Sequence, residues 1–394
     1  MSVQTIDEWG GMLKFIRYFW FFLGCVFFIP MIQAQSTVQE ICPNVGIQPR
    51  SAEFSPDGII ITAFDGTSLW VYDINRATRY PLPQSAPCTS GCNLSPDARW
   101  LSYLNPETFS FNKMRLDGTQ RTPLAPNASE VLWWNSDTLL IWTPNHRAYL
   151  RPEVDGLASP QLLDVQGIRS IQPNGQWALL IEQGADDFDR YMVNMENRGT
   201  IDEQRVFLAP DNPFFNAAAW SPDGRYLAYV GRSAFDDNVG IIGSELYLAQ
   251  PGSAIPQQMT FLFNEYGAVR INGYMPGELS WSLQGGRIAF WVIELLGSNP
   301  EANTGNAVLH ILDVNTGDVV RYCGFATTDH TPNTPRLVWS PDGTHIAFAG
   351  NVRGDNKGTL LLALNIETGI FTELSDGIFP AMGQADVYAW GFAP

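Results

Sequence analysis

Short apolar segments alternate along the chain with a tight polar turn of the Ser-Pro-Asp-Gly type. Proline presets φ at the first turn position, aspartate hydrogen-bonds back to the backbone, and glycine accepts the positive φ that a bulged hairpin requires. Each copy therefore predicts a β-hairpin whose arms are the flanking apolar segments. The seven copies begin at Ser55, Ser95, Asn135, Gln172, Ser221, Ser282 and Ser340.

Successive copies are 37 to 61 residues apart, a period that in β-rich sequence is typical of propeller blades. In the fifth unit, strands are expected at 216–221, 226–230, 245–249 and 257–261. The pattern predicts an all-β propeller of four-stranded blades, seven in number, with eight as the alternative. The segment 387–391 resembles one more lead-in strand, and 37–42 could add a strand, so we expect the two ends to pair in the closing blade.

A tryptophan stands just before the turn in several copies. A row of indoles could stack sugars or bases, but a position that recurs with the blade period favours packing between neighbouring sheets. We interpret these residues, Trp134, Trp220, Trp281 and Trp339, as core.

The string Trp-Ser-Pro-Asp-Gly-x-x-Ile-Ala-Phe at 339–348, with a near copy at 220–229, resembles the WD40-like repeat of the TolB propeller. The same repeat occurs in the propellers of prolyl oligopeptidase and dipeptidyl peptidase enzymes. The resemblance covers residues 50–394 and implies the fold while saying almost nothing about activity. We find no Gly-x-Ser-x-Gly elbow of a hydrolase domain, and too few residues precede the repeats for the extra α/β domain of TolB. The propeller is therefore expected to stand without those extra domains.

The chain begins with the features of a secretory signal. Lys14 and Arg17 precede an apolar run at 18–29, and Ile32-Gln33-Ala34 offers a cleavage site, so residues 1–34 are predicted to be a signal peptide and 35–49 an N-terminal segment. Acidic residues ahead of Met12 leave that methionine as an alternative start. We expect an exported protein, periplasmic or extracellular, or alternatively one anchored to the membrane by an uncleaved leader.

The net charge of −17 disfavours nucleic acid, DNA included, and anionic membrane surfaces as partners. The expected partner is a protein or another extracellular ligand, and a basic one would suit the charge. Membrane contact is expected only through an uncleaved leader.

Four cysteines follow the leader, and an even count in an exported chain indicates disulfides. Cys88 and Cys92 lie in one connection that can bend to join them, which leaves Cys42 with Cys323 by exclusion. A zinc site is disfavoured, because only one close pair of cysteines exists and no second pair completes four ligands.

Enzymatic motifs are missing from the sequence. The histidines are scattered over different repeats, and no phosphate loop or dinucleotide fingerprint occurs, so we predict no catalytic residue and no cofactor. Two acidic runs are more informative, and we take them as candidate polar contacts with a ligand: Asp186, Asp187 and Asp189, and Asp236 and Asp237. Ca²⁺ is a weak alternative, since neither run has the Asp-x-Asp-x-Asp-Gly layout of a dedicated loop.

Strand alternation places these acidic runs on one face of the propeller. Connections between strands one and two share a face with those between three and four, and both are tight turns. The opposite face carries the acidic runs, the cysteine-bearing connections and long insertions at 231–244, 262–277, 294–306 and 324–335; we call it the insertion-rich face. Because binding usually resides in variable loops on a rigid scaffold, we predict an exported, non-enzymatic propeller that binds through this face. The alternatives are a hydrolase or lyase that uses the acidic residues and a metal, and a membrane-anchored sensory propeller.

Overall fold

The computed structural model describes residues 38–392 except 52–53, 55, 64–67, 86–92, 126–127, 143–147, 153–160, 164–167, 184–187, 196–204, 212–216, 233–242, 273–278, 296–302, 328–333, 353–355, 357–358 and 375–385. The predicted signal peptide lies outside these residues. All of the described residues belong to the unit Ser36–Pro394. No helix among them is both long enough and apolar enough to span a bilayer.

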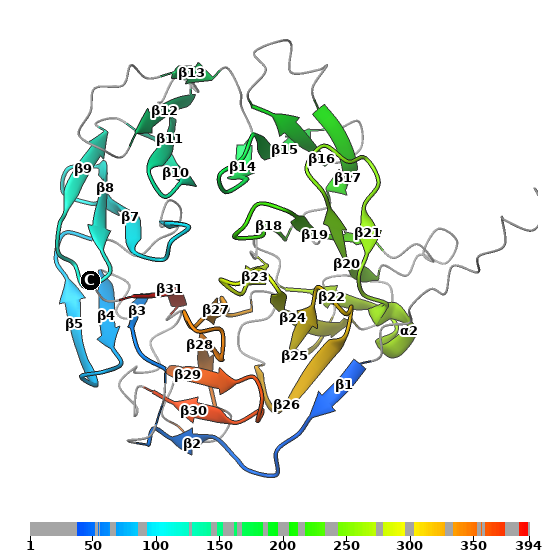
Figure 1. Cartoon of the computed structure of the whole chain (residues 1–394). Helices are drawn as coiled ribbons and strands as arrows, with labels where there is room; N and C mark the ends of the chain where they lie inside the picture. The colour runs from blue at the N-terminus through cyan, green and yellow to red at the C-terminus, as the bar shows by residue number, and fades with distance from the viewer. Residues whose placement is uncertain are drawn as a thin grey trace, which may run out of the picture. The chain divides into compact units, whose positions relative to one another are not determined.

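The described strands form seven sheets (Figure 1). The first contains β3 (Ile59–Ala63), β4 (Leu69–Asp73), β5 (Thr78–Leu82) and β31 (Asp386–Gly391). The second contains β6 (Asn93–Leu94), β7 (Trp100–Asn105), β8 (Ser110–Arg115) and β9 (Thr122–Ala125). The third contains β10 (Glu130–Asn135), β11 (Thr138–Trp142), β12 (Ala148–Pro152) and β13 (Gln161–Leu163). The fourth contains β14 (Ile168–Ile171), β15 (Trp177–Gln183), β16 (Phe188–Asn194) and β17 (Arg205–Asp211).

The remaining three sheets have the same antiparallel core, to which the sixth and seventh add one parallel strand each. The fifth contains β18 (Ala218–Trp220), β19 (Leu227–Arg232), β20 (Ser244–Ala249) and β21 (Gln257–Gln258). The sixth contains β22 (Val269–Ile271), β23 (Ser280–Trp281), β24 (Arg287–Leu295), β25 (Asn303–Asp313), β26 (Val319–Thr327) and β1 (Val38–Ile41). The seventh contains β27 (Val338–Trp339), β28 (His345–Asn351), β29 (Thr359–Asn365), β30 (Phe371–Glu373) and β2 (Gln48–Pro49).

The innermost strands of the sheets contact one another in a closed ring. The order is β6, β10, β14, β18, β23, β27 and β31, and β31 returns to β6. Figure 1 shows the sheets radiating from this ring. Such an arrangement is a β-propeller, so the predicted all-β propeller with four-stranded blades is confirmed.

The turn chemistry expected from the sequence is present in the fifth sheet. The Ser221 hydroxyl donates to Asp223 Oδ1 at 2.7 Å, and the backbone N–H of Arg225 donates to the same oxygen at 3.0 Å. Gly224 takes a φ of 71°. These local bonds join β18 to β19 as an antiparallel hairpin, as predicted.

The first copy of the turn, at residues 55–58, does not form the predicted hairpin. The strand after it, β3, pairs antiparallel with β31 from the far end of the chain. The first sheet thus takes strands from both ends of the chain, and this pairing closes the ring. The two ends do not pair with each other as predicted, because β1 lies parallel to β26 and β2 parallel to β30.

Indole N–H groups link neighbouring sheets. The donors and carbonyl acceptors are Trp133 with Asn93 at 2.9 Å, Trp281 with Ala219 at 3.0 Å and Trp339 with Ser280 at 2.9 Å. Each acceptor lies on the innermost strand of the preceding sheet. The predicted packing role is thus observed, with one correction: Trp133, not Trp134, makes the link in the third sheet. Trp133 pairs with Leu139 whereas Trp281 pairs with Ile288, so the third turn is one residue shorter.

Candidate functional site

The long insertions of the insertion-rich face are partly regular structure. The insertion at 262–277 begins with α2 (Leu262–Tyr266), followed by β22, which adds a strand to the sixth sheet. The insertions at 294–306 and 324–335 begin or end within long strands, because β24, β25 and β26 extend into them. These segments therefore broaden the sixth sheet.

Glu245 fixes α2 to the fifth sheet. Its carboxylate accepts hydrogen bonds from the Thr260 hydroxyl at 2.6 Å and from the backbone N–H groups of Leu262 and Phe263 at 2.8 and 2.9 Å. Burial raises the pKa of Glu245, and these three bonds partly offset the shift. A buried carboxylate with its acceptor sites filled in this way has a structural role, and α2 is a rigid rim of the face.

The candidate acidic residues are only partly described. Asp189 lies on β16, where it is half-buried and accepts a hydrogen bond from the Tyr191 hydroxyl at 3.3 Å. Asp186, Asp187, Asp236 and Asp237 lie outside the described residues. The structure therefore places Asp189 near the start of β16, paired with Glu182 on β15 and Pro210 on β17.

A charged pair stands where the innermost strands of the seventh and first sheets begin. The Arg336 guanidinium is 3.8 Å from Asp386 Oδ2, and the Arg336 backbone N–H donates to Asp386 Oδ1 at 3.4 Å. The same guanidinium lies 5.2 Å from the centre of the Tyr388 ring. The pair therefore joins two blades at the ring seam.

A second pair of opposite charges stands at the start of the third and fourth innermost strands. Glu130 is the first residue of β10, and Arg169 is the second residue of β14 and exposed. Burial raises the pKa of Glu130, and the positive charge of Arg169 offsets part of the shift. An innermost strand runs toward its tight turn, so its first residues lie on the insertion-rich side. We call Glu130, Arg169, Arg336, Asp386 and Tyr388 the inner-rim residues.

Two of the inner-rim strands are bulged at an inner-rim residue. The pairing of β14 with β15 shifts between Ile168 and Ser170, and the pairing of β31 with β3 skips Tyr388. A bulge inserts an extra residue, redirects its side chain and is common next to functional sites. The extra residues here are Arg169 and Tyr388, both at the inner rim.

The inner rim was not predicted from the sequence, because its charged residues do not form a cluster along the chain. These residues are single charges or aromatics, and each pair is brought together by the packing of neighbouring blades, β10 with β14 and β27 with β31. The available signal was a charged residue at the start of an otherwise apolar lead-in segment, as in Glu130-Val131-Leu132.

The histidines in the described residues are structural. Burial lowers the pKa of His310 to about 4, and the ring packs between Phe290 and Tyr266. Burial also lowers the pKa of His345 to about 4, although the negative charge of Asp342 opposes this shift. The rings of both histidines contact neighbouring protein groups, which agrees with their interpretation as strand residues.

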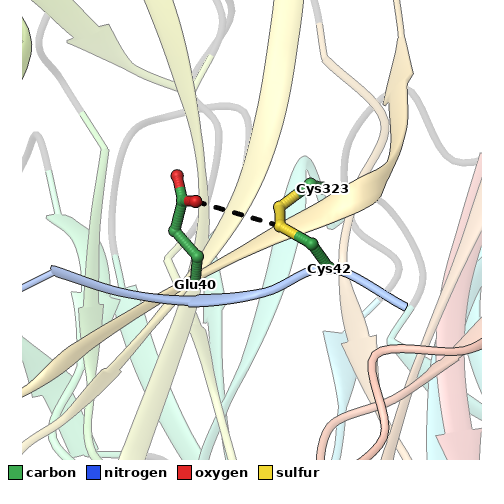
Figure 2. Close-up of side chains that lie close together, drawn as sticks. All are labelled: Glu40, Cys42 and Cys323. Atoms are coloured by element: carbon green, nitrogen blue, oxygen red, sulfur yellow. Dashed lines mark hydrogen bonds between the residues drawn. A yellow bond between two sulfur atoms is a disulfide. The ribbon is translucent and has the colours of Figure 1, made fainter. Parts of the chain in front are cut away.

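A disulfide joins Cys42 to Cys323, as predicted by exclusion, with 4.9 Å between their Cα atoms. Figure 2 shows Glu40 beside this bond, with its carboxylate 4.0 Å from the Cys42 sulfur. A disulfide sulfur is not a thiolate, so these three side chains do not form a metal site. Cys88 and Cys92 lie outside the described residues.

No protein-family model matches the chain, and no curated protein matches it. Among solved structures it is similar to TolB from Acinetobacter baumannii, with 15% identity over 91% of this chain and 98% of that one, at a TM-score of 0.43. It is also similar to a puromycin hydrolase, with 15% identity, 84% and 57% coverage and a TM-score of 0.47. The tricorn protease matches with 12% identity, 87% and 35% coverage and a TM-score of 0.47. At these identities the likeness concerns the fold alone.

Proposed function

We propose that this protein is an exported, non-enzymatic β-propeller of seven blades, one blade for each sheet, that binds a protein or another extracellular ligand through its insertion-rich face. The closed order of seven innermost strands supports this number over the alternative of eight.

The observation that carries this proposal is the inner rim. Two pairs of opposite charge and Tyr388 lie where innermost strands begin, on the insertion-rich side, and bulges set two of these five residues, Arg169 and Tyr388. On the other face, the turn carboxylates of Asp223 and Asp342 accept hydrogen bonds from their own turns. The carboxylates of these two turns are therefore occupied within single turns, whereas the inner rim brings charged groups of different blades together on the insertion-rich side.

The disulfide supports the proposed export, because such bonds persist in oxidising compartments. The proposed location is the periplasm or the cell exterior. Attachment to a membrane would follow only if residues 1–34 are retained.

Reversal of charge on the insertion-rich face tests the proposal. In the variant Asp186→Lys with Asp236→Lys, we expect weaker capture of a partner from the native envelope fraction. The salt dependence of capture should also flatten, because clustered carboxylates speed encounter with a basic partner. Arg169→Glu should likewise weaken capture if the inner rim contributes contacts. Surface plasmon resonance at several salt concentrations measures both effects once a partner is in hand.

The matched control reverses the same number of charges on the tight-turn face, with Asp137→Lys and Glu367→Lys. Both positions are exposed turn residues. Equal losses in the two double variants would mean that net charge alone matters. A loss confined to the control would place binding on the tight-turn face and contradict the proposal.

The alternative of a metal-dependent hydrolase or lyase makes a different prediction. It requires Asp186, Asp187, Asp236 and Asp237 to converge on a cation, so divalent metal should bind and the Asp→Lys variant should abolish that binding. Isothermal titration with Ca²⁺ and Mg²⁺ separates this reading from the proposed one.

A further inference from the structure

Residues 38–50 lie along the outer edges of neighbouring sheets, and we call this segment the strap. Its first part, β1, pairs in parallel with β26 of the sixth sheet, from Val38 opposite Val319 to Ile41 opposite Tyr322. Its second part, β2, pairs in parallel with β30 of the seventh sheet. Figure 1 shows β1 beside β26 and β2 beside β30.

The strap also reaches the first sheet. Arg50 Nη2 donates to the carbonyl of Ile74 at 2.6 Å, and Ile74 directly follows β4. The strap therefore crosses the seam between the seventh and first sheets, where β31 closes the ring on the inside. Two segments therefore bridge this seam: β31 near the centre of the ring and the strap at the outer edges of the sheets.

The noncovalent contacts of the strap are few. Strands β1 and β2 contain four and two residues, and Gln39, Glu40, Gln48 and Pro49 are exposed. Val38, Ile41 and Ile47 are only partly buried against the cores of the sixth and seventh sheets. Such short edge strands pair weakly without further support.

Two interactions supply that support. Glu40 accepts a hydrogen bond from Arg321 Nη1 at 2.9 Å, and the Glu40 side chain is 54% exposed, so this ion pair contributes little. Shortly after Glu40, a disulfide joins Cys42 to Cys323, which are 281 residues apart in the chain. Both cysteines are exposed, so a dithiol reductant can reach the bond.

We infer that the strap is a redox-dependent fastener, held on the rim of the ring when the Cys42–Cys323 bond is formed and released when that bond is reduced. Release is a thiol–disulfide exchange: a dithiol gives two electrons and two protons, the Cys42–Cys323 bond breaks to two thiols, and the dithiol becomes a disulfide. Release uncovers the outer edges of β26 and β30. The ring stays closed through β31, because that contact involves neither cysteine.

Hydrogen exchange of the folded chain tests this inference. The protein carries Cys25→Ser, Cys88→Ser and Cys92→Ser, so that Cys42 and Cys323 are its remaining cysteines, and exchange is followed by mass spectrometry with and without dithiothreitol. On reduction, peptides covering 38–50, 319–322 and 371–373 should exchange at least about tenfold faster. Peptides covering β18 and β19, on the far side of the ring order, should exchange at an unchanged rate.

Cys42→Ser with Cys323→Ser is the matched variant and should reproduce the pattern of the reduced chain. Glu40→Gln, which removes the ion pair and keeps the disulfide, should show little change at the same peptides. If the double serine variant does not fold, reduction of the already folded chain still gives the answer. Unchanged exchange at 38–50 after confirmed reduction would overturn the inference. Equal acceleration in every sheet would overturn it too, since the disulfide would then stabilise the whole fold.

Discussion

At the scale of single residues, the fold depends on polar side-chain atoms that recur at the same position of successive blades, namely the turn carboxylates and the indole N–H groups. Burial alone would raise the pKa of Asp342, but hydrogen bonds from Ser340 and Thr344 lower it, so the carboxylate is ionised and serves its own turn. The indoles form a second such series. Trp281 donates to the preceding sheet, whereas Trp220 Nε1 is buried without a partner. The strand before it in the ring, β14, is bulged at Arg169.

This contrast gives a matched pair of substitutions. Trp281→Phe removes an N–H···O bond of 3.0 Å and leaves the Ala219 carbonyl without its donor, whereas Trp220→Phe removes a donor that has no acceptor. Both lose similar volume. We expect Trp281→Phe to lower the free energy of unfolding by about 1–2 kcal/mol more than Trp220→Phe. Urea denaturation measures both, and equal losses would show that the indole bonds contribute nothing beyond packing.

At the scale of elements, the sixth sheet carries a row of side chains across four strands. Glu40, Arg321, His310 and Phe290 are register neighbours on β1, β26, β25 and β24. Tyr266 from α2 packs on this row, with its hydroxyl 3.1 Å from His310 Nε2. The row joins the strap, the helix and the sheet. Its buried titratable member is His310, which is neutral in the fold near pH 7 because burial lowers its pKa to about 4.

The neutral His310 makes stability depend on pH. In the unfolded chain its pKa is near 6.5, and burial lowers it to about 4 in the fold. Below pH 6.5 the unfolded chain binds the proton first, so the stability contribution is complete above pH 6.5 and is lost as the pH falls toward 4. The loss should be on the order of 3 kcal/mol.

His310→Asn isolates this effect, because asparagine is polar and does not titrate. His345 titrates in both proteins, and its contribution cancels in the comparison. The stability advantage of the wild-type chain over the variant should be constant above pH 7 and should shrink between pH 6.5 and 4 in chemical denaturation. An advantage that stays constant over that range would mean that folding does not lower the pKa of His310.

At the scale of the whole molecule, what the sequence predicts well is local. Proline, aspartate and glycine determine a turn within four residues, so the hairpins and the four-stranded units were predictable. Ring closure is nonlocal. Strand β31 pairs with β3 across more than three hundred residues, and neither strand contains a sequence feature that identifies the other as its partner. The Arg336–Asp386 pair of the inner rim depends on that closure, which explains why these two residues were not predicted as a pair. The pairing of Cys42 with Cys323 was predictable only by exclusion, because the strap contains no copy of the repeat from which its neighbours in the fold could be inferred.

Ring closure by β31 is testable by truncation. A chain ending at residue 385 loses Val387 and Trp390, which are 0% and 1% exposed, and leaves the inner edge of β3 unpaired. Loss of one buried tryptophan alone costs about 3–5 kcal/mol, and an open strand edge favours association between chains. We therefore expect a lower melting temperature in calorimetry and oligomers in sedimentation, both reversed in part by an added peptide of residues 386–392. A chain ending at Phe392 is the control and should match the full chain. Equal melting temperatures for the chain ending at 385 and the control would show that the ring is closed without β31.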